Sequence, residues 1–250
     1  MKNKLVIYTA LFGQYDDLIE PAQKYEECDF ICFTDQKDLK SDIWEIRLIE
    51  TIDLAPNMMN RKYKILPHIY LPEYQYSLYI DANIELLKNP FQVLNLIRDN
   101  TLIAVLKHEV RDCIYDEAKA CVIHGKSNLT DTIEQVLMYK SNKFPKHFGL
   151  GANRIIFREH NNQEIISLME EFWQEYKKWN TKRDQLILMY LIWKRNIKLN
   201  FIDENDFFLI HQHTEERKMT FWKKVKQKIQ VLSRTFIGNI VFYWKVEKNG

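Results

Sequence analysis

The sequence predicts an α/β fold with a mainly parallel central sheet flanked by helices. Short runs rich in β-branched and aromatic residues alternate with longer segments of helical periodicity, which is the pattern of βαβ units. The chain has 250 residues, of which 46% are hydrophobic, so it can bury one sizeable core. No internal repeat and no low-complexity linker interrupts the alternation.

Each predicted element follows from a local pattern. The strands are short apolar runs bounded by turn residues, at 5–10, 30–34, 44–48, 77–80, 102–106, 154–157 and 198–202. The helices have apolar residues every three or four positions, at 59–68, 112–121, 128–140, 163–178 and 182–195, with a pair of helices after Thr220. Asn180, Thr181 and Asp184 offer a cap for the helix at 182–195.

Charge is distributed unevenly along the chain. The 36 Lys and Arg against 34 Asp and Glu give a formal charge of +2, which does not indicate a nucleic-acid-binding protein. Residues 217–250, however, hold nine basic side chains and one acidic one, whereas the preceding 216 residues carry a net charge of −6. We therefore predict an acidic main domain over residues 1–216 and basic amphipathic helices over 217–250.

Cysteine usage and hydropathy indicate a cytoplasmic protein. The four cysteines follow no zinc or redox spacing and are too few for a disulfide framework. The apolar run near the N-terminus fits a first strand better than a signal peptide, and no segment reaches the roughly 18 apolar residues that span a bilayer.

The basic tail has the pattern of a helix that lies on an anionic membrane. Phe221, Trp222, Val225, Ile229 and Leu232 are interspersed with lysines, so an apolar face and a cationic face are expected. We predict peripheral attachment to the inner face of the cytoplasmic membrane. The alternative is a C-terminal helix that packs on the domain with its lysines outward.

Asp81 and Asn83 directly follow the predicted strand at 77–80. At positions i and i+2 they point to the same side if the chain stays extended. Their oxygens suit Mg²⁺ or Mn²⁺, which keeps positions for water and substrate phosphates, so the pair predicts a site for a metal diphosphate. In the alternative, Asp81 caps a turn and Asn83 bonds to its backbone. The uncharged Asn83 binds a metal more weakly than a second acid does.

Other polar groups are expected near the carboxyl ends of the strands, where ligands bind in open α/β sheets. The loop after the first strand offers Thr9, Ala10 and Tyr15 to a nucleotide, or is an ordinary turn into the next element.

The helix predicted at 59–68 carries three basic candidates. Arg61 and Lys64 stand at i and i+3, so both lie on one face and can neutralise phosphates together. His68 lies one turn further along that face. A solvent-exposed basic face is the alternative.

Six stretches carry a resemblance to a known family. In chain order they are YTALFGQYDDL, DFICFTD, NRKYKILPHIYLPEYQYSLYIDANI, HEVRDCIYDEA, GLGANRIIFREH and RDQLILMYLIW. Together they are similar to the glycosyltransferase-like family of plant turgor-regulation and mucilage proteins, which has bacterial members. The resemblance covers about residues 4–213 and implies a GT-A (Rossmann-like) fold and sugar transfer from a nucleotide sugar, with UDP as the carrier.

The resemblance also implies roles for single residues. Asp35 is expected to contact the base or ribose of the donor. Retaining glycosyltransferases of family 8, which are more distantly similar, bind Mn²⁺ or Mg²⁺ with an acid pair and a late histidine, here His211 rather than His213. Their Asp-Gln pair beside the donor sugar corresponds to Asp184 and Gln185. The alternatives are a helix-capping Asp184 and a hydrogen-bonded or exposed His211.

Asp112, in the segment at 108–118, is a candidate wall of the acceptor site or a base, or else part of a surface helix with paired charges. We expect a hexosyltransferase-type enzyme of bacterial surface polysaccharide synthesis with a glycan or lipid-linked acceptor. Inversion requires a carboxylate base, whereas retention lets the leaving phosphate take the proton. A non-catalytic nucleotide-sugar-binding protein is the main alternative; a lipid amide hydrolase ranks below it, because neither G-x-S-x-G nor H-E-x-x-H occurs.

Overall fold

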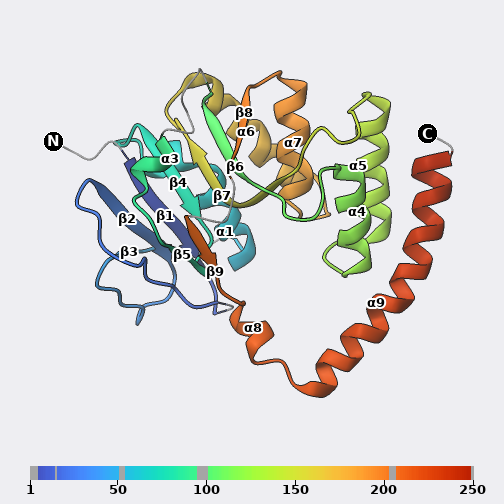
Figure 1. Cartoon of the computed structure of the whole chain (residues 1–250), viewed down its shortest axis with the longest axis horizontal. Helices are drawn as coiled ribbons and strands as arrows, with labels where there is room; N and C mark the ends of the chain where they lie inside the picture. Colours follow the sequence, from blue (N-terminus) through green and yellow to red (C-terminus); the bar gives the residue numbers. More distant parts are fainter. Residues whose placement is uncertain (1–4, 15, 51–53, 95–100, 203–206, 249–250) are drawn as a thin grey trace. The chain divides into compact units, whose positions relative to one another are not determined.

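The computed structural model describes residues 5–14, 16–50, 54–94, 101–202 and 207–248 (Figure 1). In this part of the chain a seven-stranded sheet has the order β3-β2-β1-β4-β7-β6-β8, and β5 and β9 form a separate two-stranded sheet. The strands are β1 (Leu5–Leu11), β2 (Cys28–Thr34), β3 (Glu45–Leu48), β4 (Tyr76–Ile80), β5 (Ile84–Leu86), β6 (Ile103–Lys107), β7 (Gly151–Arg158), β8 (Leu199–Ile202) and β9 (Phe208–Ile210). The helices are α1 (Pro56–Ile65), α2 (Pro67–Tyr70), α3 (Phe91–Leu94), α4 (Ile114–Ile123), α5 (Leu129–Ser141), α6 (Gln163–Lys178), α7 (Gln185–Lys194), α8 (Thr214–Arg217), α9 (Phe221–Phe242) and the π-helical η3 (Tyr243–Lys248).

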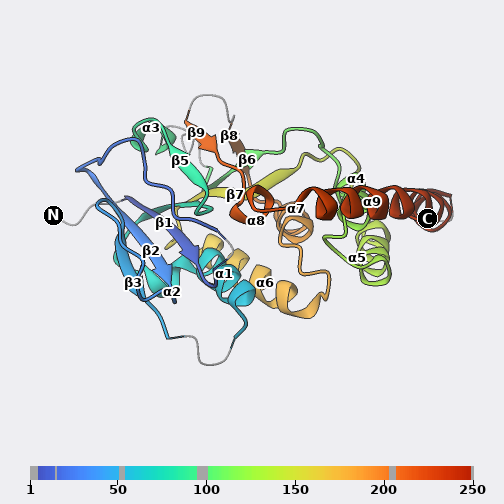
Figure 2. The ribbon, with the colours of Figure 1, turned by 90° about the horizontal axis from the view of Figure 1, so that it is seen from below.

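The predicted mainly parallel sheet is confirmed. β1 pairs in parallel with both β2 and β4, β2 with β3, and β6 with β8, whereas β7 runs antiparallel to β4. Every residue of β1 is buried, because α1, α2 and α6 lie against one face of the sheet and β5, β9 and α3 lie on the other (Figure 2). Burial on both faces explains why the strand is apolar throughout instead of alternating.

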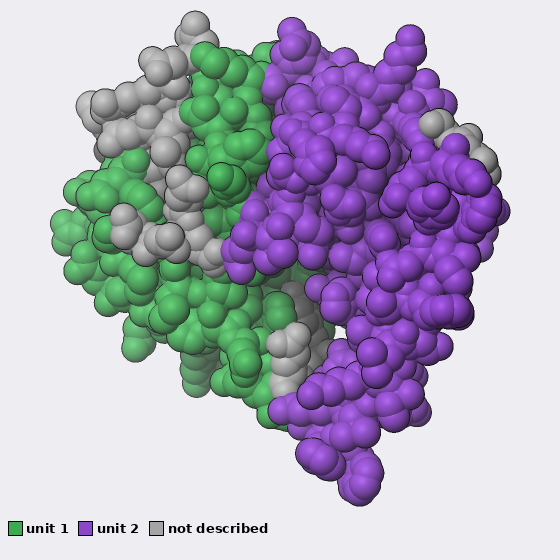
Figure 3. Space-filling model, turned by 45° about the vertical axis from the view of Figure 1, so that its right-hand side comes forward, with its two compact units in different colours: residues 1–107, 152–173, 198–218 green, residues 108–151, 174–197, 219–250 purple. Residues whose placement is uncertain are grey.

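The chain divides into two compact units (Figure 3). Unit 1 comprises residues 1–107, 152–173 and 198–218 and contains the sheet; unit 2 comprises residues 108–151, 174–197 and 219–250 and is helical. The tail therefore groups with two internal segments that lie far from it in sequence. The predicted boundary after residue 216, between the main domain and the C-terminal helices, stays a prediction.

The helix predicted at 59–68 is in fact two helices. α1 ends at Ile65, and Leu66 leaves the helical region with φ −112° and ψ 51° before α2 starts at Pro67. The ring of a proline disfavours the helical conformation of the residue before it, so Pro67 already indicated a break in the helix at the level of the sequence. His68 consequently does not continue the face of Arg61 and Lys64.

The pair of helices predicted after Thr220 is one continuous helix, α9, which runs directly into η3. Thr220 caps it by accepting a hydrogen bond from the Lys223 amide. No proline interrupts this segment, and its glycine, Gly238, is buried in packing against α4. A glycine inside a helix costs only about 1 kcal/mol relative to alanine, which such packing offsets.

Unit 2 contains a buried acid, Glu117 of α4. Arg111 Nε lies 2.6 Å and His108 Nε2 3.5 Å from its Oε2, and the Cys121 thiol donates to Oε1. Burial alone would raise the pKa of Glu117, but the hydrogen bonds from His108 and Arg111 outweigh it and lower the pKa to about 2.

Glu117→Gln tests this cluster. Because the folded-state pKa lies below the ordinary value of 4.5, Glu117 stabilises the folded protein above about pH 4.5, and the contribution disappears as the pH falls towards 2. At neutral pH we expect the variant to lose roughly 1–3 kcal/mol of unfolding free energy and to show a flatter pH dependence below about pH 5, measured by urea denaturation. Asp116→Asn, on the same helix but exposed, serves as the control. If the unfolding free energy of Glu117→Gln depends on pH in the same way as that of the unmodified protein, the assignment is wrong.

Candidate functional site

The candidate site of unit 1 lies where β1 and β4 end and α1 begins. Polar groups gather there because the carboxyl ends of parallel strands meet at one edge of the sheet. Its parts are the loop after β1, the first turns of α1, and the turn after β4.

The loop after β1 is held by side chains on both sides. The Phe12 amide donates to Asn60 Oδ1 at 2.8 Å, and Asn60 Nδ2 donates back to the Phe12 carbonyl at 3.3 Å. The Gly13 amide donates to Asp35 Oδ1 at 2.9 Å, and Gln36 Nε2 donates to the Gly13 carbonyl at 2.6 Å. Asp35, predicted to contact the donor base or ribose, thus has a clear structural partner in this loop.

Gly13 is required by the shape of the loop. Its φ of 77° lies in the left-handed region, and a Cβ placed there would stand 3.1 Å from the Pro56 Cβ. The backbone therefore passes close to the first residue of α1. Beside this contact lies a cavity of about 630 Å³, lined by Phe12, Gly13, Gln14, Pro56, Asn57, Asn60 and Arg61. Its size suits a nucleotide-sized ligand.

Lys64 and Asp81 form the charged part of the site. Lys64 is only 2% exposed, and its Nζ lies 3.9 Å from Asp81 Oδ1 and 5.0 Å from the ring centroid of Tyr79. The Tyr79 hydroxyl donates to the same carboxylate oxygen at 2.8 Å. Two candidates that the sequence indicated separately, the helix cation and the acid at the strand end, therefore lie side by side, and one oxygen of Asp81 carries both contacts.

A second buried cation, Arg158 of β7, lies behind Lys64. Its Nη2 donates to the Lys64 carbonyl at 3.0 Å and to the Tyr8 hydroxyl, and Tyr8 in turn donates to the Lys64 carbonyl at 2.7 Å. Burial lowers the pKa of Arg158, and burial also raises the pKa of Tyr8 to about 12. Tyr8 is therefore a neutral donor at physiological pH, and the guanidinium fixes the turn of α1 that presents Lys64.

Asp81, Ala82 and Asn83 form a turn and not an extended strand. The Ile84 amide donates to the Asp81 carbonyl at 3.0 Å, and β5 begins immediately afterwards. Asn83 is buried and pairs with the backbone of His211: the His211 amide donates to the Asn83 carbonyl at 2.9 Å, and Asn83 Nδ2 donates to the His211 carbonyl at 2.6 Å. Asn83 therefore bonds to backbone, as in the alternative, but to the backbone of His211 and not to that of its own turn.

Two of the three expected metal ligands have protein partners in the structure. His211 Nε2 lies 2.9 Å from Glu85 Oε2, and the Asn83 amide is engaged with the backbone. In the described part of the chain, no group of three or more His, Cys, Asp and Glu side chains has a geometry that could hold a metal ion. Asp81 alone, with a side chain 26% exposed at the sheet edge, suits the way Mg²⁺ is usually held, by one or two carboxylates together with substrate phosphates.

A further contact ties the loop after β1 to the segment after β9. His213 Nδ1 lies 2.5 Å from Asp16 Oδ2, and the Thr214 amide donates to Asp16 Oδ1 at 3.2 Å. Burial opposes ionisation of Asp16, yet the hydrogen bonds from His213 and Thr214 lower its pKa below the ordinary value. His213 thus has a structural partner of its own.

The remaining unit 1 candidates differ in where they lie. Thr9 and Ala10 are buried within β1, and Tyr15 lies outside the described residues. His68 is turned towards α6, with its Nε2 3.8 Å from Glu170 Oε1, and burial lowers its pKa. The structure thus gives His68 a partner on α6, and its predicted role at the donor site stays a prediction.

Three candidates belong to unit 2. Asp112 is exposed and bonds to His147 Nδ1 at 2.7 Å, which lowers its pKa. Asp184 is the N-cap of α7 and accepts a hydrogen bond from the Gln185 amide, as in the capping alternative, and Gln185 is the first residue of that helix. Their roles at the donor sugar or acceptor stay predictions.

Sequence reasoning missed several residues of the site, notably Asn60, Asp16, Glu85 and Arg158. Asn60 directly precedes Arg61 in the basic helix, and this position was a usable signal. Arg158 lies at the end of an apolar strand, where a charge is a signal of pairing. The partners of Asp16 and Glu85 lie 197 and 126 residues away in the sequence, so nothing local indicates them.

Comparison with known proteins adds evidence of relationship. Residues 1–221 match the family described as TOD1/MUCI70, glycosyltransferase-like domain. A protein from Arabidopsis thaliana named "Probable hexosyltransferase MUCI70" is 28% identical over 211 residues, which cover 73% of this chain and 36% of the relative. The chain thus spans about a third of the length of that curated relative.

Two solved structures are similar at low identity. The apo structure of the bifunctional glycosyltransferase WbbM is 9% identical with a TM-score of 0.48, covering 93% of this chain and 44% of that chain. Mouse xyloside xylosyltransferase 1 in its apo form is 8% identical with a TM-score of 0.45, covering 81% and 86%. These values are too low to add to the assignment of function.

Asn60→Ala tests whether this side chain holds the loop after β1. The substitution leaves the buried Phe12 amide without its acceptor, and we expect a loss of about 1–3 kcal/mol in unfolding free energy, measured by chemical denaturation. Asn57→Ala, at an exposed position of the same helix, is the matched control and should change stability by less than about 0.5 kcal/mol. Equal losses in the two variants contradict the role given to Asn60.

Proposed function

Since the chain belongs to the TOD1/MUCI70 glycosyltransferase-like domain family, we infer that it is a glycosyltransferase, and we propose that it transfers a sugar from a nucleotide-sugar donor to a glycan or lipid-linked acceptor. The observation that supports this proposal best is the pairing of the buried Lys64 with Asp81; Arg61, three residues earlier in α1, lines a cavity together with Gly13. A nucleoside diphosphate carries the negative charge that such cations attract.

The proposed chemistry follows from where charge develops. An acceptor hydroxyl attacks the anomeric carbon, the bond from that carbon to the diphosphate oxygen breaks, and the electron pair stays on the departing nucleoside diphosphate. The hydroxyl proton passes to a carboxylate base if the configuration inverts, or to the leaving phosphate if it is retained. Lys64 and Arg61 stabilise this growing charge, because cations that are held in place before reaction need little reorganisation. The Gly13 loop allows the backbone to approach the nucleotide closely.

We further propose UDP as the carrier, by the resemblance to related transferases, and bacterial surface polysaccharide synthesis as the setting. For the metal, we propose that Asp81 together with the donor phosphates holds Mn²⁺ or Mg²⁺, and that Asn83 and His211 shape the turn instead of acting as ligands. When bound, the metal supplies positive charge to the diphosphate.

A donor screen tests the proposed activity. We expect a nucleotide sugar to raise the thermal denaturation temperature and to release nucleoside diphosphate in the presence of an acceptor extract. Lys64→Gln and Arg61→Gln should each weaken donor binding by about tenfold or more, since charge-assisted hydrogen bonds contribute roughly 1.5–3 kcal/mol. Lys62→Gln, on the same helix, is the control and should bind normally. If no nucleotide sugar binds, the proposal is wrong; binding without release supports the non-catalytic alternative.

The metal assignment predicts a contrast between two variants. In the unmodified protein, Mn²⁺ should increase the stabilisation that the nucleotide sugar gives in thermal denaturation. Asp81→Asn should remove this Mn²⁺-dependent increment, because the amide brings no charge, whereas His211→Ala should keep it, since His211 Nε2 bonds to Glu85. An increment lost in His211→Ala and kept in Asp81→Asn identifies a different ligand set.

A further inference from the structure

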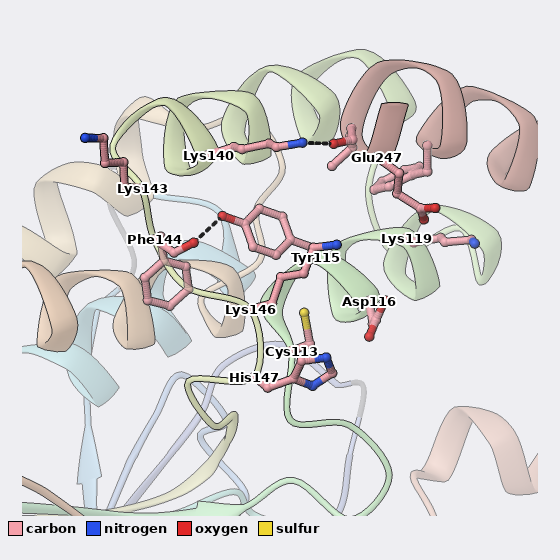
Figure 4. A pocket seen from close by; sticks show the side chains of 12 residues that line it. Cys113, Tyr115, Asp116, Lys119, Lys140, Lys143, Phe144, Lys146, His147 and Glu247 are labelled. Atoms are coloured by element: carbon pink, nitrogen blue, oxygen red, sulfur yellow. Dashed lines mark hydrogen bonds between the residues drawn. The ribbon is translucent and has the colours of Figure 1, made fainter. Parts of the chain in front are cut away.

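Helix α9 has one face that packs on unit 2. Gly238 lies close enough to α4 that an added Cβ would meet Ile123 Cγ1 at 3.3 Å, and Phe242 and Val246 are buried. At the end of the helix, Lys140 of α5 donates to the Val246 carbonyl, the bond drawn at Lys140 in Figure 4. Packing of this face accounts for how α9 is held on α4 and how η3 is held on α5.

A second apolar face of α9 is exposed to solvent. We call it the apolar stripe and define it as Trp222, Ile229, Leu232, Phe236 and Ile240 of α9 together with Tyr243, the first residue of η3. Steps of three, four or seven residues place these side chains on one side of the helix. Trp222, Leu232 and Phe236 are 77%, 71% and 70% exposed. At about 100° per residue, the stripe is centred more than about 100° around the helix from Gly238 and Phe242, so packing within unit 2 does not explain it.

The surroundings of the apolar stripe are strongly basic. Residues 219–250 contain seven Lys and Arg and a single acid, Glu247. Unit 2 as a whole has 19 basic against nine acidic side chains, a net of +10, whereas unit 1 has 17 against 25, a net of −8. Outside α9, Lys119, Lys143 and Lys146 line a cavity of about 260 Å³ against its C-terminal end (Figure 4). The positive charge is therefore a property of unit 2 and not of the tail alone.

We propose that unit 2 binds the surface of an anionic lipid bilayer, with the apolar stripe inserted at the level of the headgroups and the lysines on the anionic lipids. Trp222 at one end of the stripe and Tyr243 at the other are the residue types that favour the membrane interface. With 22 residues, α9 is about 33 Å long and lies along the bilayer. Among the described helices, none is long and apolar enough to cross a membrane.

A second copy of the chain is a poorer occupant of the stripe. Helices that pair through such a stripe place their flanking residues opposite each other and rely on opposite charges there. Lys226 and Lys228 flank this stripe, and α9 itself contains no acidic residue. Pairing two such helices brings like charges together, whereas an anionic bilayer neutralises them.

The observations that support membrane binding all come from unit 2, whereas the purpose of that binding rests on the proposed function. An enzyme held at an anionic membrane is placed where a lipid-linked acceptor is found. Binding to vesicles and turnover of the donor are separate measurements, so either proposal can fail while the other stands.

Co-sedimentation of the full chain with vesicles tests the inference. We expect binding to vesicles of equal parts phosphatidylcholine and phosphatidylglycerol, weaker binding at high salt, and much weaker binding to phosphatidylcholine alone. The triple variant Ile229→Ala, Leu232→Ala, Phe236→Ala should lower the partition coefficient at least about tenfold, because it removes three of the six inserted apolar side chains. These side chains are exposed and alanine favours helix, so the fold should be kept.

The matched control is Gln227→Ala with Gln230→Ala, two exposed positions of α9 outside the stripe, which should bind as the unmodified protein does. Equal binding of the triple variant, or no preference for anionic vesicles, overturns the inference. The inference is also overturned if the unmodified chain binds no vesicles but forms a dimer in light scattering, and the triple variant is a monomer.

With a soluble acceptor, the triple variant should release nucleoside diphosphate at the same rate as the unmodified protein. If neither the unmodified protein nor the triple variant turns over the donor, but vesicle binding follows the pattern above, the proposed function fails and the membrane inference stands.

Discussion

The buried cations of unit 1 are the constraint on which the site depends. Lys64 and Arg158 are 2% and 0% exposed, and removing a charge from water costs several kcal/mol unless partners replace the water. Here the partners are Tyr8, the Lys64 carbonyl, Asp81 and the ring of Tyr79. Because these groups come from β1, α1, β4 and β7, satisfying the two charges fixes how α1 docks on the sheet. The helix then presents Arg61 to the cavity beside the Gly13 loop.

A second set of contacts joins segments that are distant in sequence at the same edge of the sheet. Asn83 and Glu85 bind His211, and Asp16 binds His213 and Thr214. The short β5–β9 pair makes this possible, since it brings the segment after β9 alongside the turn after β4. Most polar residues named here hold loops in place, and the proposed function assigns the donor diphosphate to the basic residues of α1 and, through a metal ion, to Asp81. This division between structural and ligand-binding groups is the basis of the proposed function.

The difference in net charge is larger between unit 1 and unit 2 than between residues 1–216 and residues 217–250. The acidic unit 1 contains the sheet and the proposed donor site, and the basic unit 2 contains an exposed apolar helix face. A protein that carries an excess of positive charge beside apolar side chains is suited to anionic lipid, because each lysine adds attraction and each inserted side chain adds hydrophobic transfer energy. The sugar-transfer and membrane proposals are thus supported by different residues.

By itself, the sequence determined the class of fold, the seven main strands and most helices, since periodicity and uninterrupted apolar runs follow directly from burial on one face or two. It also indicated Lys64 and Asp81 as candidates, because helix spacing and strand ends are local features, whereas the fold decided that the two side chains pair. Tertiary structure alone decided that Asn83 binds the backbone of His211, that His68 turns to Glu170, and that β5 pairs with β9. It also decided that the tail is one helix with two apolar faces and that unit 2 is basic as a whole. The reason is physical: hydrogen bonds and packing between segments more than a hundred residues apart leave no periodic or local trace in the chain, so they become visible only when the fold brings their partners together.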